Sequence, residues 1–131
     1  MSASLVRKIT FLFTLFVLTV ILLADTGRLP GVLQFAHTIP YGDKAGHFLI
    51  VGVLCFLLSW TALQTFPRNP PGRVVTLVCL GLALFFGLEE ASQGLLRARD
   101  ASLLDLLADL AGIAVFGWLA WKFAPRRAAP V

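Results

Sequence analysis

The chain has 131 residues, of which 58% are hydrophobic and 14% are charged, and its formal net charge is +4. Soluble domains are about half apolar and about a quarter charged, so this composition excludes an ordinary soluble fold and indicates a membrane protein. The basic residues stand singly or in pairs at the ends of apolar runs. That distribution is typical of the flanks of membrane spans, and it excludes a nucleic-acid-binding surface.

The first apolar run, residues 9–24, predicts a membrane-spanning helix. Arg7 and Lys8 precede it, and a basic pair before an apolar core is also the pattern of a secretory signal peptide. Signal-peptide cleavage favours small residues at positions −3 and −1, whereas Leu22 occupies −3 before Asp25. We therefore expect a retained span, with cleavage as the alternative.

Three further apolar runs, residues 46–66, 74–96 and 103–123, are each long enough to cross a bilayer. The alternation of a transmembrane strand is absent, so helices are expected. The short segments between the last three runs predict antiparallel neighbours. The predicted fold is all-α, a polytopic membrane protein with one domain, residues 1–131, built as a bundle of four transmembrane helices. Cys55 and Cys79 fall within apolar runs and are expected to pack as small hydrophobic residues.

The distribution of Lys and Arg predicts the orientation. With four spans, one side of the membrane carries Arg7, Lys8, Arg68, Arg73, Lys122, Arg126 and Arg127, and the other carries Arg28, Lys44, Arg97 and Arg99. Because the side richer in basic residues stays in the cytoplasm, both termini are expected there. Trp60, Trp118 and Trp121 are then expected near the cytoplasmic interface.

Polar residues from three distant stretches are predicted to meet at the opposite, outer side. The candidate binding residues are Asp43, Lys44, His47, Glu90, Gln93, Arg99, Asp105 and Asp109. Glu90 and Gln93 share a helix face, as do Asp105 and Asp109, because their spacings are i,i+3 and i,i+4. Ala108 and Gly112 lie on the same side of the helix as Asp105 and Asp109. Two small residues four positions apart allow a neighbouring helix to approach closely, so the acidic face is expected to point into the bundle.

Simpler roles for several of these residues stay open. Arg97 and Asp100 suit a solvated loop, Lys44 suits the flank of a span, and Asp105 suits the first turn of a helix. For Glu90, Gln93 and Asp109 two roles remain open. They serve the function of the protein, or they only form hydrogen bonds that hold neighbouring helices together. No nucleophile motif or metal-ligand spacing accompanies the cluster, so we assign no catalytic residue, metal or cofactor.

The sequence resembles the VanZ-like family of small bacterial membrane proteins, named for a teicoplanin-resistance protein. The resemblance covers residues 43–117 and is carried by "DKAGHF" (Asp43–Phe48), then by Glu90, Gln93, Arg99, Asp105, Asp109 and Gly112 at the family's spacings. Many members have tyrosine at the position of Val51 and asparagine at that of Asp109. The resemblance implies a bacterial cytoplasmic (inner) membrane and a role in the cell envelope, including glycopeptide antibiotic susceptibility, but it supplies no reaction.

Our leading hypothesis is that the outward-facing site binds or handles a membrane lipid headgroup or a lipid-linked cell-wall precursor. The alternatives are a membrane enzyme that uses the histidine and carboxylates, a proton-coupled transporter, and a structural or partner-binding subunit. Each of these functions is compatible with an oligomer or a protein partner. None of them involves nucleic acid.

Overall fold

A computed structural model describes residues 2–28, 31, 42–93 and 103–125 of the chain. The long helices among these residues are α1 (Ala3–Asp25), α3 (Gly42–Thr65), α4 (Pro71–Gln93) and α5 (Leu103–Lys122). They contain 20 to 24 residues each, so each extends about 30–36 Å and matches a bilayer's hydrocarbon core. All four are long and apolar enough to span a membrane, which confirms the all-α, multi-pass prediction.

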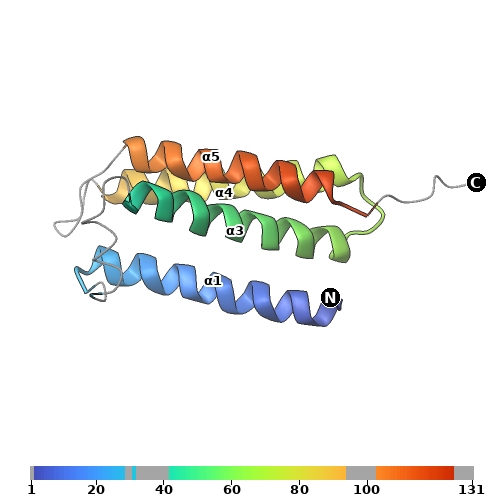
Figure 1. Ribbon diagram of the computed structural model, residues 1–131, viewed down its shortest axis with the longest axis horizontal. Coiled ribbons are helices and arrows are strands. Elements are labelled where there is room, and N and C mark those ends of the chain that lie inside the picture. Colours follow the sequence, from blue (N-terminus) through green and yellow to red (C-terminus); the bar gives the residue numbers. More distant parts are fainter. Residues whose placement is uncertain (1, 29–30, 32–41, 94–102, 126–131) are drawn as a thin grey trace, which may run out of the picture.

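Figure 1 shows α3, α4 and α5 packed side by side, with α1 running along α3 on the outside of this group. The helices α3 and α5 begin where α4 ends, at the left of the view, and we call this the polar end of the bundle. The helix α1 begins at the opposite end, where α3 and α5 finish. Consecutive helices among α3, α4 and α5 are therefore antiparallel, as predicted.

Tryptophans gather at the end opposite the polar end. Trp60 lies near the finish of α3, and Trp118 and Trp121 lie near the finish of α5, where both rings are about half exposed. The Lys122 Nζ stands 4.8 Å from the centre of the Trp118 ring, a cation–π distance. Indole rings and a lysine side chain at this depth suit a membrane–water interface.

Several helices begin earlier than the apolar runs predicted. The helix α1 starts at Ala3 because the Ser2 side chain accepts a hydrogen bond from the Leu5 N–H at 3.2 Å and caps the helix. The helix α4 starts with Pro71, whose fixed φ and missing N–H suit the first turn. The helix α3 starts at Gly42 rather than at residue 46, so Asp43 and Lys44 belong to its first turn.

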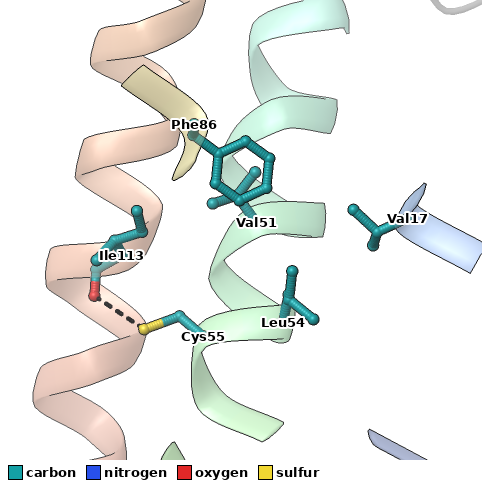
Figure 2. Close-up of a cluster of buried hydrophobic side chains, with 6 residues drawn as sticks. All are labelled: Val17, Val51, Leu54, Cys55, Phe86 and Ile113. Atoms are coloured by element: carbon teal, nitrogen blue, oxygen red, sulfur yellow. Dashed lines mark hydrogen bonds between the residues drawn. The ribbon is translucent and has the colours of Figure 1, made fainter. Parts of the chain in front are cut away.

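The apolar core lies midway along the bundle, where Val17, Val51, Leu54, Cys55, Phe86 and Ile113 are each at most 4% exposed (Figure 2). The outer faces of the helices remain apolar as well. Leu77, Leu80, Leu84 and Leu88 follow one face of α4 and are all more than 60% exposed. A continuous exposed leucine stripe is stable against lipid tails but not against water, which agrees with a membrane location.

The closest helix contact is between α3 and α5, and glycine makes it possible. A Cβ at Gly112 would collide with the backbone carbonyl oxygen of Phe48 and would stand 3.2 Å from the backbone N of Gly52. On the other side of the contact, a Cβ at Gly52 would collide with the Phe116 ring. The predicted close approach at Gly112 is confirmed, because two backbones meet here with no side chain between them.

The helix α1 is joined to α3 by hydroxyl groups within the span. Thr10 is 5% exposed, its Oγ1 donates to the Val6 carbonyl at 2.9 Å, and it lies 2.8 Å from Thr61 Oγ1 on α3. Interhelical hydrogen bonds of this kind stabilise helix pairs in lipid by about 0.6 kcal/mol on average. They fix α1 beside α3 while much of its surface faces outward.

Two thiols from neighbouring helices meet in the core. Cys55 Sγ on α3 lies 3.7 Å from Cys79 Sγ on α4, and Gly117 leaves the space, since its Cβ would stand 2.5 Å from Cys79 Sγ. Cys79 also lines a groove of about 380 Å³ between α4 and α5.

We expect a membrane-soluble oxidant to cross-link Cys55 and Cys79 in native membranes, which intact mass spectrometry would detect as the loss of two hydrogens. Two free thiols after oxidation, with a single-cysteine variant as reference, would contradict this helix register.

Candidate functional site

The polar residues of the three packed helices form a layer directly above the apolar core. Val51, Phe86 and Ile113 meet in the core. His47, Glu90 and Asp109 each stand four positions from one of these residues, toward the polar end. Because residues four apart share a helix face, these three side chains point into the same interior space one turn further out. The core packing of α3, α4 and α5 therefore fixes the site's floor and its first polar layer.

The outer part of the cluster is held by a lysine between two helices. Lys44 Nζ donates to Asp43 Oδ2 at 2.8 Å within α3 and to Asp105 Oδ1 at 3.0 Å on α5. The Lys44 side chain is 27% exposed and that of Asp105 is 13% exposed, so this ion pair lies at the rim of the bundle. Lys44 thus joins the first turns of α3 and α5 rather than only flanking a span.

A histidine–carboxylate pair lies one turn deeper. His47 Nδ1–H donates to Asp109 Oδ1 at 2.9 Å, and His47 Nε2 lies 3.8 Å from Asp105 Oδ2. The Asp109 side chain is 1% exposed and that of His47 is 24% exposed. The carboxylate holds the imidazole in place, and the imidazole forms part of the accessible surface of the site.

The helix α4 contributes a buried glutamine whose partner was not predicted. Gln93 Nε2 donates to both carboxylate oxygens of Glu89, at 2.6 and 2.7 Å. Sequence reasoning grouped Gln93 with Glu90 on one face and omitted Glu89, although Glu89 and Gln93 have the i,i+4 spacing that marks a helical pair. Glu90 and Gln93 are 4% and 0% exposed, so the face that they were predicted to share is a buried one.

Burial is deepest at Asp109 and Gln93, which are both fully buried. Asp109 Oδ2 and Gln93 Oε1 have no hydrogen-bond partner among the residues that the structure describes. A buried polar atom without a partner costs about 1–3 kcal/mol, so native proteins rarely retain one unless something satisfies it. The cluster therefore carries hydrogen-bonding capacity beyond what its own contacts use.

The structure brings seven of the eight predicted binding residues to one end of the bundle: Asp43, Lys44, His47, Glu90, Gln93, Asp105 and Asp109. The eighth, Arg99, lies outside the described residues, as do Arg97 and Asp100. The role of Arg99 as a binding residue remains a prediction.

The arrangement suits hydrogen bonding and proton exchange more than nucleophilic attack. An imidazole next to two carboxylates can accept and release protons. The hydroxyl of Ser92 is exposed and donates to the Glu89 backbone carbonyl at 2.6 Å. In the described part of the chain, no group of three or more His, Cys, Asp or Glu side chains has a geometry that would hold a metal ion.

Comparison of this chain with family models, with curated proteins and with solved structures found no match.

Proposed function

We propose that this protein is a VanZ-like protein of the bacterial inner membrane whose polar cluster binds the headgroup of a membrane lipid or of a lipid-linked cell-wall precursor. One observation carries the proposal: two fully buried side chains, Asp109 and Gln93, each keep an acceptor oxygen that no described residue satisfies. A headgroup that enters from the bilayer surface would supply the missing partners.

The location of the cluster supports an amphiphilic ligand. Its rim, formed by Lys44 and Asp105, is partly exposed at the polar end, and the outer faces of the surrounding helices are apolar. A lipid places its headgroup at the depth of the first helical turns and its tails along such faces. One lipid molecule would thereby contact both the polar cluster and the apolar helix faces, whereas a small soluble ligand would contact only the polar cluster.

The excess of Lys and Arg on the side of the termini supports cytoplasmic termini, and the polar end would then face outward. Lipid-linked cell-wall precursors and glycopeptide antibiotics meet at that face of a bacterial membrane. Binding of a precursor at the cluster would give the protein its place in the envelope and an effect on glycopeptide susceptibility.

Lipid retention tests the proposal. The full-length protein is extracted from membranes with an amphipathic polymer, and the lipids around it are compared by mass spectrometry with those of the bulk membrane. We expect the wild type to enrich a particular lipid class and the double variant Lys44→Met, Gln93→Leu to lose the enrichment, because both the rim and the buried acceptor change. Thr19→Val is the control, since the exposed Thr19 hydroxyl donates to the Leu15 carbonyl of its own helix and to no other residue that the structure describes. If the lipids retained by the wild type have the same composition as the bulk membrane, headgroup binding is refuted.

A further inference from the structure

The unsatisfied atoms of the cluster are of one chemical kind. Asp109 uses Oδ1 to accept from His47 and keeps Oδ2, which is an acceptor when the carboxyl group is ionised. Gln93 must turn its NH₂ toward Glu89, because an ionised carboxylate can only accept, so the buried Oε1 is the atom that remains. What the site still requires is therefore hydrogen-bond donors.

The two acceptors lie on inward faces of adjacent helices. Gln93 stands seven positions beyond Phe86 on α4, and Asp109 stands four positions before Ile113 on α5. Both spacings bring a side chain back to the face that packs in the core (Figure 2). Both residues therefore lie on helix faces that turn toward the interior of the three-helix group, on the polar side of the apolar core.

A charged donor suits the two buried acceptors better than a neutral donor. Lys44 donates to Asp43 and Asp105, and His47 donates to Oδ1 of Asp109, so the acceptors in question are Asp109 Oδ2 and Gln93 Oε1. Hydrogen bonds between a cation and a carboxylate are roughly twice as strong as neutral ones, which favours a positive group that donates N–H bonds.

We infer that the site selects an amphiphile whose headgroup carries a primary ammonium, an inference that rests on the proposed headgroup binding. A primary ammonium offers three N–H donors, enough for Asp109 Oδ2 and Gln93 Oε1 with one remaining. A quaternary trimethylammonium has the same charge and no N–H, and proteins bind it with aromatic faces rather than with carboxylates. A buried polar site discriminates strongly against an analogue that lacks the required donor, because its own groups then stay unpaired.

The experiment compares headgroups on identical acyl chains. Purified, delipidated full-length protein in detergent is titrated with phosphatidylethanolamine, phosphatidylcholine and phosphatidylglycerol, and bound lipid is counted by native mass spectrometry. We expect phosphatidylethanolamine to bind at least about tenfold more tightly than phosphatidylcholine, as the loss of one or two buried hydrogen bonds implies. Asp109→Asn, which replaces an acceptor with a donor, should abolish this preference, whereas Thr19→Val should retain it.

A second pair of ligands distinguishes the source of the ammonium. A polyprenyl diphosphate that carries a sugar-linked peptide with a free amine is compared with its N-acetylated form. Tighter binding of the free-amine form than of phosphatidylethanolamine would assign the site to a lipid-linked precursor, and the reverse would assign it to a phospholipid. Equal binding of the ethanolamine and choline lipids, or the tightest binding by phosphatidylglycerol, would overturn the ammonium inference while leaving headgroup binding intact. No saturable binding of any lipid would overturn headgroup binding itself.

Discussion

Replacing Gly112 with alanine is expected to separate α3 from α5 and to destabilise the protein more than any other single-methyl change in the bundle. The new Cβ would collide with the Phe48 carbonyl oxygen, which is a backbone atom and cannot rotate away. Overpacking of a close contact typically costs about 1–3 kcal/mol, and here the cost falls on a contact between two backbones. The midpoint of thermal unfolding in detergent, followed by helical circular dichroism, measures the effect.

The same substitution should also weaken the site, because Asp109 and His47 are presented by the two helices that would move apart. Gly81→Ala on α4 and Gly46→Ala on α3 are matched controls, since a Cβ at either position meets nothing within 4 Å. Alanine favours a helix over glycine by about 1 kcal/mol, so both controls should be neutral or stabilising. An unchanged midpoint for Gly112→Ala would mean that α3 and α5 do not approach as described.

Replacing His47 with phenylalanine is expected to destabilise the protein by at least about 1–3 kcal/mol, because it removes the hydrogen-bond donor of the fully buried Asp109. The double variant His47→Phe, Asp109→Leu should recover much of this loss. Replacing both partners with apolar groups leaves neither member of the pair as a buried polar group without its partner, and a buried pair exchanged for hydrophobic residues is often neutral. Unfolding midpoints of the wild type, the two single variants and the double variant form the cycle that isolates the pair.

The outcome distinguishes a structural role of the pair from a binding role. If the double variant regains stability but does not retain lipid, the histidine and aspartate serve the ligand rather than the fold. Additive losses in the cycle would show that the two side chains do not interact. Thr10→Val is a useful comparison, since it disturbs the α1–α3 hydroxyl contact but none of the contacts of the polar cluster.

The site owes its geometry to the apolar core below it. His47, Glu90 and Asp109 are one turn from Val51, Phe86 and Ile113, so any change in how those apolar side chains pack is passed to the polar layer through three rigid helices. Cys55 Sγ also lies 3.6 Å from the Ile113 carbonyl oxygen (Figure 2). Core and site therefore form one unit, and the core substitutions that matter most for binding are those facing the polar layer.

The sequence alone determined the fold class and the end of the bundle at which the polar residues gather. Four apolar runs of about 20 residues have few physical solutions in lipid, because an unpaired backbone group there is costly. Once the helices alternate in direction, the beginnings of α3 and α5 must meet the finish of α4, and the residues at those positions meet with them. The inward face of Asp105 and Asp109 followed from their spacing and from Gly112.

Only the tertiary structure decided which side chains pair. The rotation of each helix about its axis depends on how Gly112, Gly52 and Phe116 fit together, and no periodicity of a single helix encodes that fit. This rotation paired Lys44 with Asp105 and His47 with Asp109. The bond between Gln93 and Glu89 lies within α4 and needs only the i,i+4 spacing. The tertiary structure also leaves one acceptor oxygen of Asp109 and one of Gln93 buried without a partner among the described residues. Hydrogen-bond satisfaction depends on distances of a few tenths of an ångström, which spacing along the chain does not specify.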